Sequence, residues 1–164
     1  MCGFIWASVP ASAIADRVQL GASTIARDLR VNAELALLRP SPDRWSVLEY
    51  GAHVRDVILH LRDRFVIALV EDEPTFKPLY REERVALGLY AHDTVEHVAK
   101  DLEMAANLFA RTFAAISTEQ LARECQYTYP TVARRTLLWM AQQMVHEVEH
   151  HLGDVAVDLQ LLDG

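Results

Sequence analysis

Apolar residues recur every three or four positions over four long stretches of the chain, and this spacing predicts four amphipathic helices. The first helix is expected over residues 12–36 and is ended by the proline-containing turn 39–42. The second begins at Ser46, which forms a capping box with Glu49, and it stops before the proline-containing stretch 71–78.

The second half of the chain continues the helical pattern. The third helix is expected to begin at Asp93, capped reciprocally with Glu96, and the fourth to follow Pro130 and run over 131–161. The segment 80–90 is ambiguous between a loop and a short helix, and strand signals are weak. Helices therefore dominate, and one connection is long. This pattern predicts an all-α four-helix bundle with one longer crossover.

Length and composition fit a single domain over residues 1–164, because 51% hydrophobic and 24% charged residues are ordinary for a protein with a buried core. A net charge of −7 argues against a nucleic-acid partner. No apolar stretch approaches the roughly 20 residues that span a bilayer, so no membrane partner is expected.

The two cysteines favour a cytoplasmic location. Cys2 and Cys125 lie far apart and neither belongs to a C-x-x-C motif, so a disulfide framework is not expected. Cys125 is expected to be a small buried hydrophobic residue. The apolar N-terminus lacks the basic segment that opens a secretory signal.

The most informative stretch for chemistry is HEVEHHLGDV, residues 146–155, which contains the H-E-x-x-H pattern of zinc proteases. In that interpretation His146 and His150 would bind zinc and Glu147 would be the general base. We reject it because the third-ligand position falls on Ala156, the helical pattern continues beyond it, and no sheet is evident to hold a peptide.

Helix geometry selects a different pair. Residues advance about 100° each around a helix, so with Val148 at the centre of the apolar stripe, His151 lies about 60° to one side and Glu147 about 100° to the same side. His146 and His150 lie about 160° away and are expected to face solvent or a partner subunit. Glu147 and His151 therefore project together along the border of the core, at the spacing of a metal-binding pair.

A third donor is expected from the second helix. His53 lies on the border of its apolar stripe, and Asp56 and His60 follow on the same side. The levels at which the two helices meet depend on the topology of the bundle, so His53 is our first choice and His60 is the alternative. If a metal binds, Asp56 and Asp154 are candidates to orient the ligand imidazoles. If no metal binds, all these residues are ordinary partly buried polar groups.

Two stretches resemble the metal-bearing helices of the DinB superfamily, which includes YfiT-like proteins and mycothiol-dependent maleylpyruvate isomerase. They are RWSVLEYGAHVRDVILHLRDR, residues 44–64, and MVHEVEHHLGDV, residues 144–155. Registering the Leu-Gly-Asp ending on the family's last-helix motif implies ligands at Glu147 and His151, and the family's second-helix ligand falls on His53. Glutamate at the first of these last-helix positions is typical of the mycothiol-dependent branch.

The resemblance implies a two-nitrogen, one-oxygen site with open positions, which suits zinc and also nickel, iron or manganese. It implies a metal-dependent transferase or isomerase that acts on a small molecule and uses a low-molecular-weight thiol such as mycothiol. Arg55, Arg81 and Arg84 are candidates to hold carboxylates of the thiol or the substrate.

Three alternatives remain open. The same ligands suit a metal-dependent hydrolase, and DinB-like domains also occur as stress-linked proteins without an assigned reaction. The third alternative is a helical bundle whose histidines serve only to assemble a dimer. Trp139 and Val157 are expected on the outer face of the fourth helix, opposite the core, and exposed apolar residues there favour a homodimer.

Overall fold

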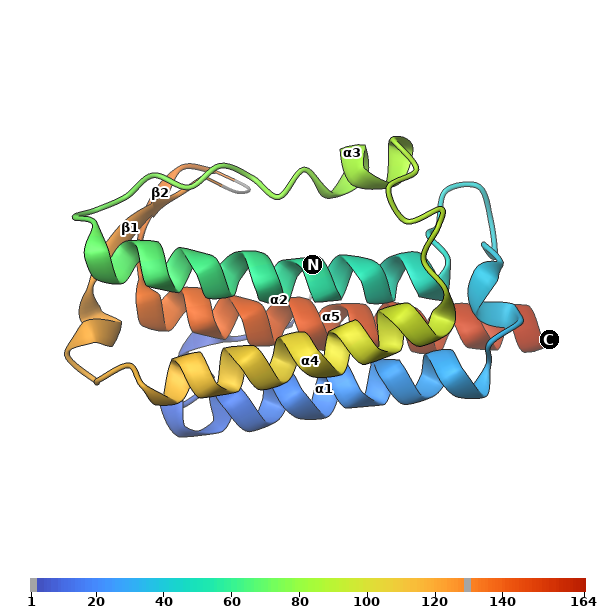
Figure 1. The fold of residues 1–164 in the computed structure, drawn as a ribbon, viewed down its shortest axis with the longest axis horizontal. Helices are drawn as coiled ribbons and strands as arrows, with labels where there is room; N and C mark the ends of the chain where they lie inside the picture. Colours follow the sequence, from blue (N-terminus) through green and yellow to red (C-terminus); the bar gives the residue numbers. More distant parts are fainter. Residues whose placement is uncertain (1–2, 129–130) are drawn as a thin grey trace.

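The computed structural model describes residues 3–128 and 131–164, and within them four long helices pack into an elongated bundle (Figure 1). A two-stranded hairpin and three 3-10 turns add little to this architecture. The predicted all-α four-helix bundle is therefore confirmed. The four helices are α1 (Ala11–Val31), α2 (Val47–Val70), α4 (Val95–Ala114) and α5 (Leu137–Asp163).

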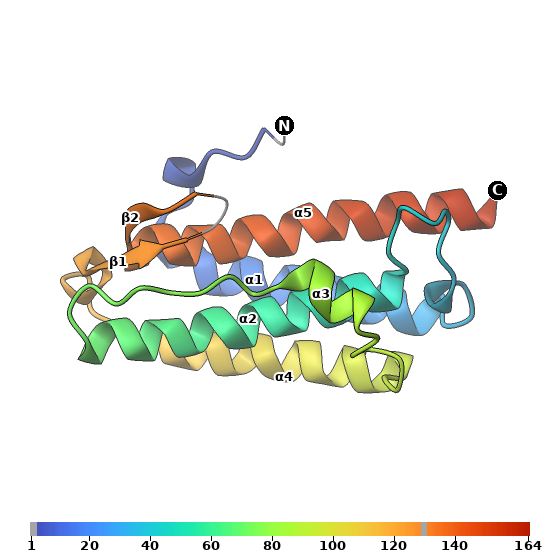
Figure 2. The ribbon, with the colours of Figure 1, turned by 90° about the horizontal axis from the view of Figure 1, so that it is seen from above.

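The order of the helices around the bundle differs from their order along the chain. Helices α1 and α2 lie on a diagonal, and each packs against both α4 and α5. Helices α2 and α4 run in one direction and α1 and α5 in the other (Figures 1 and 2). Because α2 and α5 are antiparallel neighbours, the first turns of α2 lie beside the C-terminal half of α5.

The long connection between α2 and α4, residues 71–94, runs along the outside of the bundle (Figure 2). An isolated parallel bridge between Thr75 and Gln126 fastens its beginning to the hairpin. Its second half contains the short helix α3 (Arg81–Ala86), so the ambiguous segment 80–90 is in part helical. The connection crosses the length of the bundle, which is why α2 and α4 are parallel.

Two predicted helix ends are wrong by a few residues. Helix α1 ends at Val31 and not at 36, because the chain turns into a 3-10 segment, η2 (Leu35–Leu37). Helix α4 is capped by Thr94, whose Oγ1 accepts the backbone N–H three residues on, and not by Asp93. The Asp93 carboxylate instead pairs with Arg55 at 2.9 Å.

The predicted start of the fourth helix is also wrong. Helix α5 begins at Leu137, where the Thr136 side chain caps it. After η3 (Gln120–Ala122), the segment before α5 forms an antiparallel hairpin of β1 (Glu124–Tyr127) and β2 (Ala133–Thr136). Pairing with a partner strand satisfies the backbone of residues 133–136, which no local periodicity reveals. Pro130, the expected start signal, lies outside the described residues.

Helix α2 begins where the sequence predicts. Ser46 Oγ accepts the Glu49 backbone N–H at 3.2 Å, and the Glu49 carboxylate accepts the Ser46 N–H at 2.8 Å. This reciprocal capping box satisfies two backbone donors that the first turn leaves unpaired. It also fixes the start of the helix that carries His53 about two turns later.

Helices α1 and α5 approach closely at Gly21. A Cβ built on Gly21 would lie 2.4 Å from Cγ1 of Val148, so only glycine fits there without movement of the neighbour. Gly153 on α5 is the opposite case, because a Cβ there would meet nothing within 4 Å. The contact at Gly21 fixes how closely α5 lies against the core.

The buried thiol of Cys125 confirms its expected role as a small hydrophobic residue in the core. Cys2 lies outside the described residues. Among the described helices, none combines the length and the apolar character that crossing a membrane requires.

Candidate metal centre

His53, Glu147 and His151 converge between α2 and α5, and one potential ligand atom of each lies within 4.8 Å of the others. Oε2 of Glu147 is 3.8 Å from Nε2 of His53 and 3.6 Å from Nε2 of His151. The two imidazoles are nearly perpendicular, with ring centroids 4.7 Å apart. The antiparallel packing of α2 and α5 brings the three side chains to one level.

Three of the four imidazole nitrogens of this cluster lack hydrogen-bond partners. Both ring nitrogens of His53 and Nε2 of His151 are buried without a hydrogen bond. A buried polar group left unpaired costs about 1–3 kcal/mol, so proteins seldom leave several of them together. A divalent metal ion between these atoms would satisfy Nε2 of both imidazoles and the carboxylate at once. The donor set therefore fits a metal such as zinc.

Neighbouring side chains orient two of the three donors. Nδ1 of His151 lies 2.9 Å from the Asp154 carboxylate, which directs Nε2 toward the cluster. Nε2 of Gln143 donates to Oε1 of Glu147 at 2.7 Å and leaves Oε2 facing the histidines. Gln143 is a residue of the site that was not predicted from the sequence. Its spacing of four residues before Glu147 was the available signal.

The protonation states of His53 and Glu147 suit a metal. Burial lowers the pKa of His53, which favours the neutral imidazole, and one of its two ring nitrogens then has a lone pair free for a metal. Burial alone would raise the pKa of Glu147, but interactions with His146, His151 and His53 hold it well below its ordinary value. A neutral imidazole and an ionised carboxylate are the protonation states that bind a metal ion. At His151 burial acts to lower the pKa, but interactions with Asp154 and Glu147 raise it, so a metal ion that binds there displaces a proton.

His60 and Asp56, which were candidates for the site, contact other side chains and not the cluster. Nε2 of His60 interacts with Arg64 at 2.7 Å, so His60 belongs to a different group of side chains. The Asp56 carboxylate accepts hydrogen bonds from Arg55, Arg84 and the Tyr90 hydroxyl and is not brought to the imidazoles. Of the three arginines considered as carboxylate binders, Arg55 and Arg84 are thus engaged with Asp56, and Arg81 lines the pocket and pairs with Glu82.

The outer face of α5 is covered by the N-terminal segment. His146, expected to face solvent or a partner, packs against the rings of Phe4 and Trp6, with centroids 5.1 Å and 5.0 Å away. The sequence could not indicate this contact, because it joins the two ends of the chain. Trp139 stacks on Trp6 and is partly covered, whereas Val157 is 45% exposed.

His150 is exposed, as expected, and lies 3.8 Å from the Asp154 carboxylate. With His151 and Asp154 it makes a second group of potential ligand atoms. That group shares His151 with the buried cluster, and its exposed histidine distinguishes it from a closed site. The buried cluster is therefore the stronger candidate for a metal centre.

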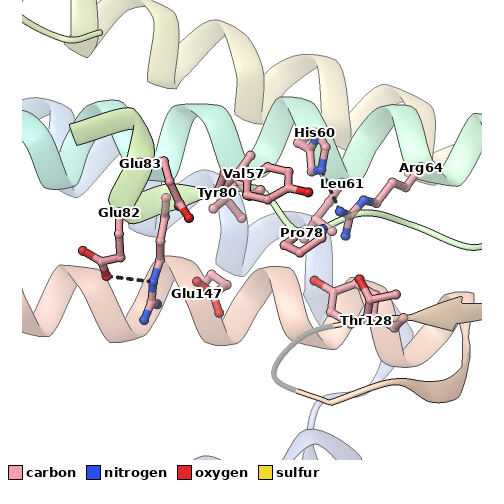
Figure 3. Close-up of a pocket in the computed structure, with 13 residues that line it drawn as sticks. Val57, His60, Leu61, Arg64, Pro78, Tyr80, Glu82, Glu83, Thr128 and Glu147 are labelled. Carbon is pink, nitrogen blue, oxygen red and sulfur yellow. Dashed lines mark hydrogen bonds and ion pairs between the residues drawn. The ribbon is translucent and has the colours of Figure 1, made fainter. Parts of the chain in front are cut away.

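A pocket of about 350 Å³ opens beside the cluster (Figure 3). Its lining comes from α2, the crossover with α3, the end of β1 and, from α5, Glu147. Glu147 thus belongs to both the pocket and the cluster. The lining comprises Val57, His60, Leu61, Arg64, Pro78, Leu79, Tyr80, Arg81, Glu82, Glu83, Tyr127, Thr128 and Glu147.

The fold and this cluster define a four-helix-bundle protein with a candidate metal centre beside a pocket. The family model of the DinB superfamily matches residues 22–155, and the chain belongs to that superfamily. Among curated proteins no match was found.

Solved structures share the fold. YfiT from Bacillus subtilis, described as a probable metal-dependent hydrolase with an unusual four-helix bundle topology, superposes with a TM-score of 0.82 at 13% identity, over 92% of this chain and 86% of that one. The mycothiol-dependent maleylpyruvate isomerase superposes with a TM-score of 0.70 at 18% identity, over 93% of this chain and 63% of that one. A histidine-to-alanine mutant of the isomerase gives the same TM-score at 17% identity.

Proposed function

We propose that this protein is a metal-dependent enzyme in which His53, Glu147 and His151 hold one divalent ion, with zinc first and nickel, iron or manganese as alternatives. The observation that carries the proposal is the convergence of three donors, with unpaired buried nitrogens, at the edge of a pocket. Three protein ligands with further positions open are typical of a catalytic site.

The reaction that we favour is a transfer or isomerisation that uses a low-molecular-weight thiol such as mycothiol. A divalent ion at the cluster would supply a Lewis acid that lowers the pKa of a thiol or of water. The protein offers no competing thiol among the described residues, because Cys125 is buried and burial raises its pKa to about 11. The nucleophile is therefore expected to enter through the pocket.

The residues of the chain have distinct roles in this proposal. Asp154 holds the proton on Nδ1 of His151, and Gln143 fixes the Glu147 carboxylate. Burial of His53 and His151 keeps bulk water from the nitrogens. The fold shared with the mycothiol-dependent isomerase supports the thiol reaction, and the fold shared with YfiT supports hydrolysis as the second candidate.

Metal content tests the first part of the proposal. Protein purified without a histidine tag should contain about one divalent metal per chain by elemental analysis, and His53→Gln should lose it. His60→Gln is the matched control, because it changes the same residue type on the same helix outside the cluster. Equal metal content in the two variants would exclude His53 as a ligand.

Activity tests the second part. Metal-loaded protein should consume mycothiol together with an electrophile, 1-chloro-2,4-dinitrobenzene, and chelation should abolish this. Cleavage of p-nitrophenyl acetate without a thiol would favour the hydrolase instead. If metal-loaded protein shows neither activity, the remaining interpretation is a metal-binding module without a reaction. The homodimer expected from the exposed Val157 would then be tested by light scattering.

A further inference from the structure

The pocket contains a buried guanidinium without an acidic partner. Arg64 is 5% exposed and lines the pocket, and Figure 3 shows it reaching toward Pro78. Its Nη2 donates to the backbone carbonyl of Lys77 and contacts Nε2 of His60 at 2.7 Å. Within residues 3–128 and 131–164, no carboxylate lies within ion-pair distance of it. Arg55 on the same helix, by contrast, pairs with Asp56 and Asp93.

The contacts of Arg64 hold the guanidinium in place without cancelling its charge. The guanidinium carbon lies 5.1 Å from the ring centroid of Phe76 and 5.2 Å from that of Tyr127, in cation–π range. Burial, with the charge of Arg64, lowers the pKa of His60 to about 4, so this imidazole is a neutral acceptor. A carbonyl, a neutral imidazole and two rings orient the cation, and none of them is its counter-ion.

The charge distribution in the pocket favours an anion at this end. A guanidinium has five N–H donors, and the contacts to His60 and Lys77 leave several of them unused. The acidic residues Glu82 and Glu83 are exposed on α3, and Glu82 pairs with Arg81 at 3.3 Å. These two acids therefore lie toward solvent, and the third acid of the lining, Glu147, belongs to the metal cluster, while Arg64 lies in the interior of the pocket.

We propose that this pocket binds a small organic carboxylate, with its carboxylate on Arg64 and its apolar body against Leu61, Pro78 and Tyr127. The N–H donors on Nε and Nη1 of Arg64 have no partner among these contacts, and a carboxylate oxygen would accept from them in a charge-assisted hydrogen bond. A volume of about 350 Å³ accommodates a molecule of this kind. The same pocket reaches Glu147, so the rest of the ligand is directed toward the metal cluster.

This inference rests on the proposed function only for the reaction of the ligand, because binding at Arg64 does not require the metal. Binding is therefore measured by calorimetry on chelator-treated, metal-free protein. The probes are benzoate and butyrate, with the neutral amides benzamide and butyramide as isosteres. At least one carboxylate should bind, about tenfold or more tightly than its amide. Equal binding of acids and amides, or binding of neither acid, would overturn the inference.

Variants locate the subsite. Arg64→Gln should weaken binding of the carboxylate about tenfold or more, whereas Arg62→Gln, an arginine on the same helix that pairs with Asp63, should leave it unchanged. Circular dichroism and the melting temperature check that each variant folds. If Arg64→Gln does not fold, Arg64→Lys keeps the charge without the Nε and Nη1 donors of the guanidinium and should bind less tightly than wild type. Undiminished binding in a folded Arg64 variant would refute the assignment.

His53→Gln separates this inference from the proposed function. This variant should lose the metal and keep the affinity of metal-free wild type for the carboxylate. Loss of carboxylate binding in His53→Gln would place the anion at the cluster and not at Arg64. A wild-type protein without metal that still prefers acids to amides would refute the metal centre and support the anion subsite.

Discussion

Replacement of Gln143 by leucine tests whether the hydrogen bond to Glu147 prepares the metal cluster. Gln143 is buried, and leucine has a similar size, so the change removes the 2.7 Å bond from Nε2 to Oε1 of the carboxylate, together with the 2.9 Å bond that Oε1 of Gln143 accepts from the Trp6 indole. Without it, the carboxylate is free to rotate away from the histidines. We expect Gln143→Leu to fold and to bind zinc less tightly.

The expected magnitude follows from the charge of the acceptor. A hydrogen bond to a charged group contributes about 1.5–3 kcal/mol, and each 1.4 kcal/mol is about tenfold in affinity. If the whole contribution holds Glu147 in position, Gln143→Leu should raise the Kd for zinc about 10- to 100-fold. Residues that orient metal ligands typically have effects of this size.

The assay is competition for zinc against a fluorescent chelator, with wild type and variants at equal concentration. Gln142→Leu is the matched control, because Gln142 is also buried but donates to the backbone carbonyl of Val9 at 2.9 Å. It should lose about 1 kcal/mol of stability and keep the Kd for zinc. A zinc Kd within about twofold of wild type in folded Gln143→Leu, or an equal loss in both variants, would refute the reasoning.

Three further outcomes are expected. Gly21→Ala should lower the free energy of unfolding by about 1–3 kcal/mol through the clash with α5, whereas Gly153→Ala should raise it by up to about 1 kcal/mol, both measured by urea denaturation. In a Cys2→Ser background, Cys125 should resist Ellman's reagent at pH 8 until the protein unfolds, because its raised pKa leaves little thiolate; rapid native labelling would contradict this. The pKa of His60 is about 4 in the folded protein and near 6.5 in the unfolded chain, so the unfolded state binds more protons between these two pH values. The free energy of unfolding should therefore fall as the pH drops from 6.5 toward 4, and it should fall less steeply in His60→Gln.

Features that depend on one helix were predictable from the sequence. The spacing of Glu147 and His151 and the capping box at Ser46 each follow from positions a turn apart. The choice between His53 and His60 required the level at which α2 meets α5. Helix periodicity favours His53 on the border of the apolar stripe but gives no such level, and the resemblance to a family decides between the two histidines.

Features that depend on distant segments were not predictable. The cover over His146 comes from Phe4 and Trp6, more than 130 residues away in sequence. Arg64 has the charge of a solvent-facing residue, and the aromatic groups that bury it come from the crossover and the hairpin. The helix face of Asp56 predicts that it orients the imidazoles. The hydrogen bond that it accepts from Arg84 on α3 joins two separate elements, so periodicity within α2 does not indicate it.

The close approach of α1 and α5 at Gly21 has a consequence for variation at a distance. Gly21 touches Val148, the residue that follows Glu147, so the surface of α1 at this point sets the rotational register of α5. A larger residue at position 21 would turn or shift α5 and so change the direction of the Glu147 carboxylate, without contacting any of the three candidate metal ligands. Selections for altered metal preference or turnover should therefore recover substitutions on α1 as well as in the pocket.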